Sequence, residues 1–221
     1  MTLSLTYILI AITVITSLIG FSNQKVIDDL IFYPPAITQK NQWYRFITCG
    51  FIHADTGHLL FNMLSFYFFG QTQQGITGVE DNFIAAFNSK GEMLYVLLYF
   101  STLVVCLLPT YIKHKNDYHY KSLGASGAVS AIIFVGIFIA PLNKIGLFII
   151  PPIIPGFIFA PIYLVISGYL AKRGGGNINH SAHLWGALYG LVYFIVMCFL
   201  ITNINPLTNF TDQITMWFKS F

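Results

Sequence analysis

The sequence predicts an all-α polytopic membrane protein, a single domain over residues 1–221 in which six transmembrane helices form a bundle. Two features of composition indicate this class: 56% of the residues are hydrophobic and only 9% are charged, whereas soluble domains carry about 25% charged residues. The third observation is that apolar runs of about 20 residues, the length that crosses a bilayer core, recur along the chain. The expected spans are about residues 3–21, 54–70, 93–111, 123–140, 152–170 and 182–201.

The first two apolar runs differ in how clearly they begin. No lysine or arginine precedes residues 3–21 and no small-x-small cleavage site follows them, so we expect a retained span and not a cleaved signal peptide. The second run is interrupted by polar residues, among them His58 and Asn62. Its helix begins either near Phe46 or near Thr56, and the sequence leaves both starts open.

The later runs are apolar, but the fifth is crowded by four prolines: Pro151, Pro152, Pro155 and Pro161. Proline removes a backbone donor and loosens or kinks a membrane helix. Two interpretations carry equal weight, a helix that begins only after Pro155 or a span that can tilt aside. The sixth run covers residues 182–201, and the tail after Thr202 is expected to be short and polar.

The composition also excludes other classes of protein. Disorder requires low hydrophobicity and high charge, and a nucleic-acid binder requires a basic stripe, which a net charge of +3 spread thinly along the chain does not form. The three cysteines (Cys49, Cys106 and Cys198) are too scattered for a disulfide framework, and no CxxC or Cys/His metal spacing occurs. We expect no metal, no cofactor and no nucleic-acid partner, and a lipid bilayer around the chain.

Strongly polar residues inside the apolar runs mark a candidate site, because such groups are costly in a bilayer and usually functional. Ser126, within Gly124-Ala125-Ser126-Gly127, and His183 each stand near the start of a span. Spans two, four and six run in one direction, so these two residues should lie at a similar depth near one face. His58 and Asn62, four residues apart, share one side of the second span.

These residue types together are what acyl transfer requires. A histidine can take the proton of a serine hydroxyl and so make it nucleophilic. A histidine N–H, an asparagine amide and a backbone N–H can stabilise an oxyanion, and Gly124 and Gly127 allow close backbone approach beside the serine. No acidic residue lies near His183 in these spans, so the sequence predicts a dyad of Ser126 and His183 and not a triad.

Each motif also has a structural interpretation. Taken alone, residues 124–127 are more typical of a small-residue strip for close helix packing, and packing is the favoured interpretation of the GxxxG spacing of Gly186 and Gly190. A single histidine inside a membrane is often a satisfied interior group. The joint occurrence of the polar residues on three parallel spans favours a site.

Three motifs, in this order on spans two, four and six, resemble the rhomboid family of intramembrane serine proteases. They are His53-x4-His58-x3-Asn62, Gly124-Ala125-Ser126-Gly127 and Ala182-His183-x2-Gly186-x3-Gly190. The first loop adds Trp43 and Arg45, which resemble the tryptophan–arginine element of the family. The resemblance implies that these two residues hold the first loop in place and that their role is structural.

The resemblance also implies catalytic roles. Ser126 would be the nucleophile, His183 the general base, and His58 and Asn62 would form the oxyanion hole with the Ser126 backbone. Substrates would be single-span membrane proteins cut in or next to the transmembrane segment, often beside a small residue. The protein would be a multi-pass protein of the cell inner or plasma membrane, and its fifth span a candidate lateral gate.

Two other functions compete with this one. A catalytically silent rhomboid-like protein would bind membrane proteins and hand them on, but it need not keep both Ser126 and His183, so their presence favours the enzyme. A small transporter would be expected to show paired repeats or acidic residues within its spans, and the sequence shows neither.

Two residues depart from or complicate the family pattern. Some members of the family have an aromatic residue one turn after the nucleophile, stacked on the catalytic histidine, and here that position is Ser130. The smaller side chain would hold His183 less tightly. His180 lies three residues before His183, and we assign it to the loop or an interface, because the glycine-containing motif follows His183.

Loop charges and the family layout give opposite orientations in the membrane. With both termini cytoplasmic, as is usual in the family, only Lys90, Lys144 and Lys219 of the eleven lysines and arginines would lie inside. The positive-inside rule predicts the reverse arrangement. The compartment that the site faces therefore stays open, as do the natural substrate and the oligomeric state.

Overall fold

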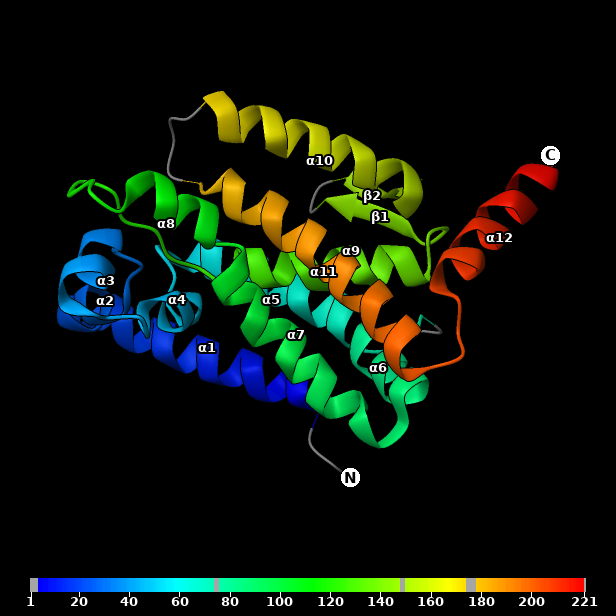
Figure 1. Cartoon of the computed structure of the whole chain (residues 1–221), viewed down its shortest axis with the longest axis horizontal. Helices are drawn as coiled ribbons and strands as arrows, with labels where there is room; N and C mark the ends of the chain where they lie inside the picture. The colour runs from blue at the N-terminus through cyan, green and yellow to red at the C-terminus, as the bar shows by residue number, and fades with distance from the viewer. Residues whose placement is uncertain (1–3, 74–75, 148–149, 174–177, 221) are drawn as a thin grey trace.

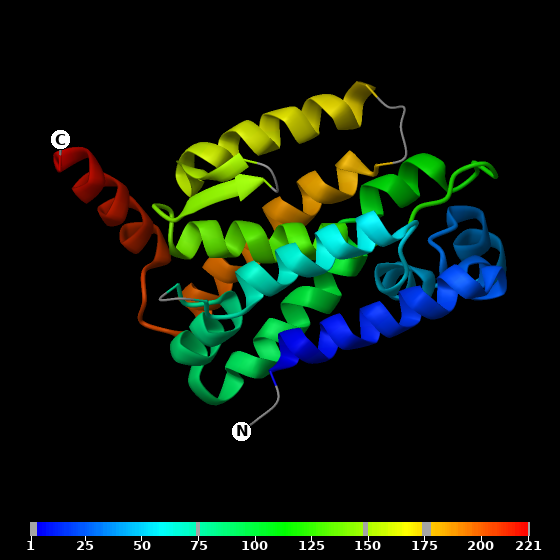
Figure 2. The ribbon, with the colours of Figure 1, turned by 180° about the vertical axis from the view of Figure 1, so that it is seen from behind.

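The computed structural model describes residues 4–73, 76–147, 150–173 and 178–220, which form a bundle of helices around one buried helix. That helix, α9 (Ser126–Ile139), has nine buried residues and contacts helices on several sides. Figures 1 and 2 show α9 in the middle of the bundle, with α10 (Gly156–Arg173) on one outer side and α1 (Leu5–Ser22) on the other.

A helix lies in each of the six expected ranges: α1, α5 (Thr56–Gly70), α7 (Gly91–Val105), α9, α10 and α11 (His180–Ile201). Residue 3, at the start of the first range, lies outside the described residues. Within the described part of the chain, three stretches are long and apolar enough to cross a membrane: Leu5–Ser22, Val79–His114 and His180–Ile201. Helix α9 is a shorter apolar helix.

Proline explains two differences from the expected helix ranges. The third range breaks after α7 and resumes as α8 (Leu108–His114), with a proline in the first turn of α8, a position that proline favours. The expected range 152–170 is wrong at its start, because residues up to Pro155 belong to strand β2 (Ile150–Pro155). This strand pairs antiparallel with β1 (Lys144–Leu147). The helix begins at Gly156, which agrees with the interpretation of a late start.

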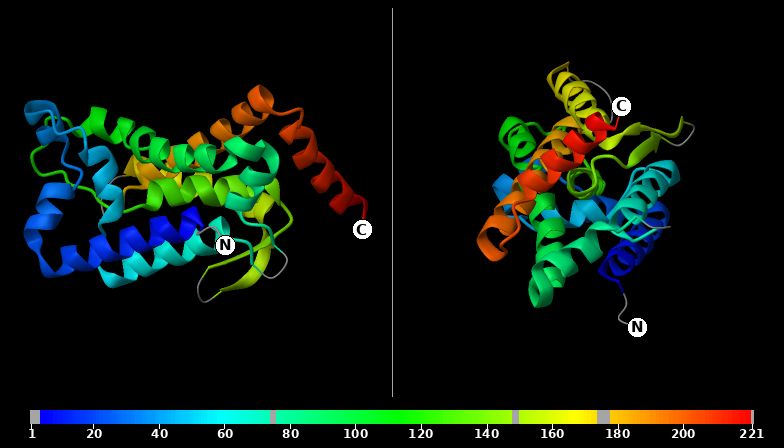
Figure 3. Two further views of the ribbon diagram at one scale, coloured as in Figure 1. Left: turned by 90° about the horizontal axis from the view of Figure 1, so that it is seen from below. Right: turned by 90° about the vertical axis from the view of Figure 1, so that its right-hand side faces the viewer.

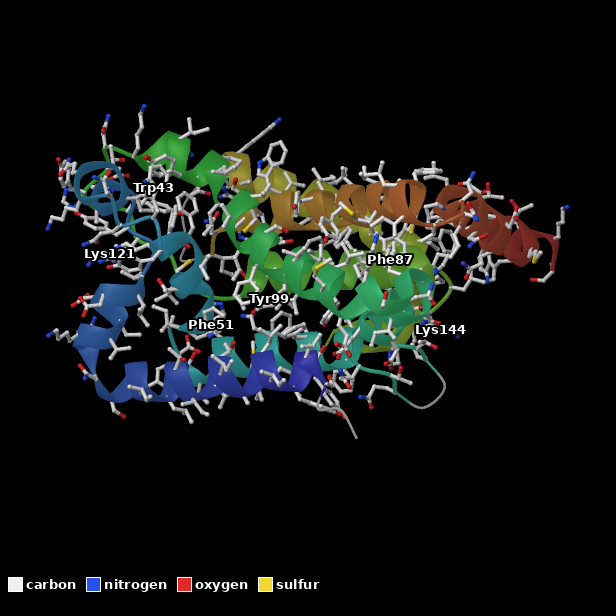
Figure 4. All side chains as sticks on the ribbon, turned by 60° about the horizontal axis from the view of Figure 1, so that its bottom comes forward. Trp43, Phe51, Phe87, Tyr99, Lys121 and Lys144 are labelled. Carbon is white, nitrogen blue, oxygen red and sulfur yellow. The ribbon has the colours of Figure 1, made fainter. Side chains whose placement is uncertain are left out.

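The connections contain short helices. The first loop holds α2 (Gln24–Leu30), α3 (Pro34–Lys40), α4 (Arg45–Thr48) and the 3₁₀ turn η1 (Cys49–Phe51); the second holds α6 (Val79–Phe87) and η2 (Asn88–Lys90). In Figure 4, Trp43 of the first loop and Lys121 lie at one end of the bundle, and Lys144 lies towards the other. The helices are therefore capped at both ends by folded connections.

The tail after Thr202, expected to be short and polar, contains the helix α12 (Pro206–Lys219), which has an apolar side. The ring of Phe210 stacks on Phe138 of α9 with ring centroids 4.8 Å apart. Trp217 meets Phe157 of α10 edge-on at 5.3 Å. Apolar residues spaced three and four apart fall on one side of a helix, and in this segment polar residues stand between them.

Candidate active site

The structure brings Ser126 and His183 together at one end of the bundle. Ser126 is the first residue of α9 and His183 lies in the first turn of α11. The His183 Nε2 atom is 2.6 Å from the Ser126 Oγ atom, which is hydrogen-bonding distance. Both residues are half-buried. Helices α5, α9 and α11 run in the same direction in Figure 1, so their N-terminal ends meet at this end of the molecule.

The backbone before Ser126 has a shape that glycine alone fits well. Gly124 has φ +114°, a conformation that side chains with a Cβ rarely adopt. A Cβ at this position would also come within 2.7 Å of the His58 ring. The Gly124 N–H donates to the Cys49 carbonyl at 2.9 Å, so the first loop fixes the turn that leads into the serine.

Close packing of α9 against α11 sets the distance between serine and histidine. A Cβ on Gly186 would lie 2.1 Å from the Gly127 carbonyl oxygen, and a Cβ on Gly190 would lie 2.7 Å from the Ala131 Cβ atom. Both glycines of the GxxxG spacing therefore lie directly against α9. In this arrangement, the small residues of the two motifs act in packing while Ser126 and His183 face each other.

The start of α5 at Thr56 resolves the alternative that the sequence left open for His58 and Asn62. The Asp55 side chain caps the helix by accepting from the His58 backbone N–H at 2.8 Å. His58 is half-buried, and its ring lies against Gly124. Asn62 is 2% exposed, and its amide donates to the His58 carbonyl at 2.9 Å.

His53 has a structural role that the sequence did not reveal, although it belongs to the first motif. The side chain is 1% exposed, and its Nε2 atom accepts from the Ala125 N–H at 3.4 Å. Its Nδ1 atom lies 3.0 Å from the Ser17 Oγ atom, and Ser17 donates to the Phe51 carbonyl. A neutral imidazole with its proton on Nδ1 satisfies all these contacts. His53 thus ties the residue before the nucleophile to α1.

Asn179 is a second residue with a structural role at the site that the sequence did not reveal. Its side chain caps α11 by accepting from the Ala182 N–H at 3.0 Å, and its amide donates to the Thr110 hydroxyl at 3.3 Å. These two bonds fix the first turn of α11, which carries His183, against α8. The signal was present, because asparagine is a preferred residue at the position just before a helix.

Trp43 and Arg45 lie in the first loop, away from the serine–histidine pair. Arg45 is 6% exposed and its Nη1 atom donates to the carbonyls of Asp28 and Ile31 at 2.9 and 2.7 Å. The Trp43 ring stacks on Phe46 at 6.0 Å. These contacts join separate turns of the loop to one another.

Ser130 and His180 lie beside the pair. Ser130 is buried one turn after Ser126, and its hydroxyl lies 3.5 Å from the hydroxyl of Tyr163 on α10. The rings of His180 and His183 are 5.9 Å apart. Within the part of the chain that the structure describes, His183 forms its side-chain hydrogen bond with Ser126 and none with a carboxylate.

A small cavity of about 10 Å³ adjoins Ser126, which is room for about one water molecule. Its lining includes Cys49, Cys106, Gly124 and Asn179. Over the described ranges, no group of three or more histidine, cysteine or acidic side chains is arranged to hold a metal. The arrangement therefore offers a hydroxyl nucleophile, a nitrogen base and little space beside them.

Comparison with known proteins gives one consistent family. The Rhomboid domain family matches residues 40–199. The chain is 32% identical over 159 residues to the RHOMBOID-like protein 12, mitochondrial, of Arabidopsis thaliana, covering 67% of this chain and 45% of the relative. It is 28% identical over 162 residues to the Rhomboid-like protein 11, chloroplastic, of the same plant, covering 68% and 51%. The chain thus spans about half the length of the two plant relatives.

A bacterial relative is matched over more of its length. The chain is 26% identical over 190 residues to the Rhomboid protease GlpG of Haemophilus influenzae, and the match covers 84% of this chain and 88% of that protein. The family match covers more than half of the chain, and the helices described above supply apolar stretches long enough to cross a bilayer. The protein therefore belongs to the rhomboid family and is an integral, multi-pass membrane protein.

Proposed function

We propose that the protein is an intramembrane serine endopeptidase with Ser126 as nucleophile and His183 as general base. The observation that carries this proposal is the 2.6 Å contact between the Ser126 hydroxyl and the His183 Nε2 atom, formed by residues 57 positions apart in the chain. A hydroxyl becomes an effective nucleophile when a base within hydrogen-bonding distance takes its proton. The protease named among the relatives supports the same activity.

The proposed reaction has two acyl-transfer steps. The Ser126 Oγ atom attacks the peptide carbonyl while His183 accepts the hydroxyl proton, and His183 then gives that proton to the leaving amine. Water attacks the resulting ester and loses a proton to His183. His183 then returns this proton to the Ser126 Oγ atom as the carboxylic acid product leaves. The Ser126 N–H belongs to the first turn of α9, where backbone donors lack helical partners, and with His58 and Asn62 it would stabilise the oxyanion.

The substrates we propose are single-span membrane proteins, and the layout we propose has six transmembrane helices. Hydrolysis needs water, so the pair must open to one membrane face and be shielded laterally from lipid. The small cavity beside Ser126 favours a small residue at the scissile bond. The outer helix α10 would be the side from which the substrate segment enters.

The test is labelling and cleavage by the purified protein in detergent. A fluorophosphonate probe should label the intact protein, and Ser126→Ala should abolish both labelling and cleavage of a single-span substrate while leaving thermal stability nearly unchanged. His183→Ala should have the same effect. Full cleavage by Ser126→Ala would overturn the proposal. Folded, unlabelled wild-type protein that still binds the uncut substrate would favour the silent binding protein.

A third variant measures the oxyanion contribution. Asn62→Ala should lower turnover by at most about 10²- to 10³-fold, the usual loss for one oxyanion donor, because the Ser126 N–H and His58 remain. A change in the Michaelis constant alone would place Asn62 in substrate binding instead. The experiment should follow turnover and the Michaelis constant separately.

A further inference from the structure

The charged side chains are divided unevenly between the two ends of the bundle. The end that carries Ser126 holds eight of the eleven lysines and arginines and four of the eight acidic residues. Figure 3 shows the short helices of the first loop, in blue, at this end and α12, in red, at the opposite end. The positive net charge of the chain therefore lies at the end of the candidate nucleophile. The eight cations are Lys25, Lys40, Arg45, Lys113, Lys115, Lys121, Lys172 and Arg173.

Four of these cations come from two segments that are far apart in the sequence. Lys113 and Lys115 stand at the end of α8 and just after it, and Lys172 and Arg173 end α10. All four side chains are exposed. Over the described ranges, the salt bridge of a lysine or arginine with a carboxylate involves Lys121 and none of these four. Their charge is therefore not neutralised by a carboxylate of the described residues.

The two segments lie on either side of the start of α11. Helix α11 packs against both α8 and α10, and Figures 1 and 2 show its first turns between these two helices. The first turn carries His183. Because His180–Ile201 is long and apolar enough to cross a membrane, its start lies at the boundary of the hydrocarbon core, where the lipid headgroups begin. The four cations therefore lie at headgroup depth.

An exposed apolar stripe runs along α11 from the same end. It consists of Trp185, Val192, Val196 and Phe199, which are all exposed and whose spacing places them on one side of the helix. From the first of these residues to the last, the stripe is about 21 Å long, more than the thickness of one leaflet of about 15 Å. The tryptophan is at the cationic end, which is the depth that this side chain prefers in membranes. An acyl chain of one leaflet can therefore lie along the stripe.

We propose that the start of α11 binds an anionic phospholipid, with its phosphate group on the four cations of α8 and α10 and its acyl chains along the stripe. Arginine and lysine both bind phosphate through charge-assisted hydrogen bonds. An acidic peptide or a free phosphate would match the cations and leave the stripe uncovered. A zwitterionic lipid would cover the stripe without neutralising the cations. A lipid with an anionic headgroup matches both features, and its binding does not depend on the proposed protease activity.

The first experiment measures lipid binding to the purified, delipidated protein in detergent by native mass spectrometry. Phosphatidylglycerol, which is anionic, is compared with phosphatidylcholine that carries the same acyl chains. We expect one phosphatidylglycerol to bind in preference, because each cation near an anionic lipid surface contributes about a fivefold gain in affinity. Lys172→Gln with Arg173→Gln should lower the affinity roughly 25-fold, and Lys113→Gln with Lys115→Gln should do the same. Equal binding of the two lipids would overturn the proposal.

The matched control removes two other cations from the same end of the bundle. Lys25 on α2 and Lys40 on α3 are exposed, and replacing both by glutamine changes the net charge by the same amount. This variant should change the affinity by less than about twofold, because salt screens exposed charges that do not contact the lipid. A loss equal to that of the α8 and α10 variants would show that the lipid responds only to the total charge, and the site would be wrong. Thermal unfolding in detergent checks that all variants are folded.

A second measurement uses the tryptophans of the intact chain. Phosphatidylglycerol brominated on its acyl chains, added at one lipid per protein, should quench the fluorescence of Trp185. Most of the quenching should be lost in Trp185→Phe and none in Trp43→Phe, which removes an exposed tryptophan of the first loop. Inorganic phosphate or a polyglutamate peptide at the lipid concentration should not displace the lipid, since neither covers the stripe.

Equal quenching in the wild type and Trp185→Phe would contradict the position of the acyl chains. Displacement by phosphate or by the peptide would show that the cations take any anion, and the lipid site would be wrong. Neither measurement uses cleavage, so a failure of the proposed protease function would be seen separately, in fluorophosphonate labelling.

Discussion

Helices α1 and α10 lie on opposite outer sides of the bundle and are attached in different ways. Both expose apolar side chains, for example Ile15 at 58% on α1 and Val165 at 73% on α10. Helix α1 is joined to its neighbours by polar contacts near both ends, through Glu80 and Thr6 at its start and Ser17 near its end. Over the described ranges, the side-chain hydrogen bond that joins helix α10 to another helix is that of Tyr163 with Ser130 at 3.5 Å.

The difference shows what fixes a helix in a membrane. Lipid is as apolar as a leucine side chain, so the hydrophobic effect does little to hold helices together, and close packing and hydrogen bonds decide. The Glu80 carboxyl group accepts from the Leu5 and Thr6 N–H groups at 2.8 and 2.9 Å and from the Ser4 hydroxyl at 2.7 Å. Helix α1 therefore has more polar contacts with its neighbours than α10, and we expect α10 to be the more easily displaced of the two.

Removing the anchor of α1 should give the largest effect. Glu80→Ala leaves two backbone donors and the side chains of Ser4 and Gln71 without their partner. Because unpaired buried polar groups are costly, we expect a loss of about 3 kcal/mol. The thermal midpoint should fall by roughly 6–12 °C.

The control is Asp81→Ala, the neighbouring acidic residue in the first turn of α6. Asp81 is exposed, and its carboxylate accepts from the exposed Thr72 hydroxyl and not from α1. It should change the midpoint by less than about 2 °C, since surface substitutions usually have small effects. Equal losses in both variants would show that the carboxyl group of Glu80 does not anchor α1.

Tyr95→Phe should have the second largest effect. The Tyr95 and Thr6 hydroxyls lie 2.6 Å apart and both residues are fully buried, so the variant leaves the threonine hydroxyl without this partner. We expect a loss of about 1–1.5 kcal/mol in thermal or denaturant unfolding. Tyr99→Phe is the matched control, because the buried Tyr99 hydroxyl has no hydrogen-bond partner in the described structure. That variant should be neutral or slightly stabilising.

Ser17→Ala, a substitution in α1, should have a smaller effect, which we expect in the reactivity of Ser126. The variant removes the partner of His53, which holds the Ala125 N–H just before Ser126. Because this hydrogen bond orients the His53 ring, its loss should slow fluorophosphonate labelling of Ser126 about three- to tenfold. Ser22→Ala, where the hydroxyl bonds only its own helix, should leave labelling unchanged. Equal labelling rates in the wild type, Ser17→Ala and Ser22→Ala would show that the Ser17–His53 contact does not affect the site.

Tyr163→Phe should have the smallest effect on stability, below about 0.5 kcal/mol, because its bond is long and interhelical hydrogen bonds in membranes are weak on average. Thermal unfolding measured beside Tyr95→Phe compares the same chemical change on the two sides of the bundle. If Tyr163→Phe lowers the free energy of unfolding as much as Tyr95→Phe does, α10 is attached as strongly as α1 and the distinction between the two helices is wrong.

Ser126 and His183 could be selected as candidates from the sequence alone. A serine among glycines and a histidine in an apolar run each stand out from their own neighbours in the chain. The membrane class followed from composition in the same way. The sequence left two interpretations of the fifth span open, a helix that begins after Pro155 and a span that can tilt aside. Proline disfavours a helix before Pro155, but it does not predict the strand β2 that is found there. The helical tail was missed because its apolar residues are interspersed with polar ones.

The sequence by itself determined the membrane environment, the helical class and the identity of the polar residues that stand out, because composition and spacing along one chain decide these. Tertiary structure alone decided which groups meet. The 2.6 Å contact of Ser126 with His183 depends on how closely Gly186 approaches Gly127, and the roles of His53 and Glu80 depend on donors 72 and 75 residues away. Contacts of this kind arise only when separate helices pack, and no local pattern records them.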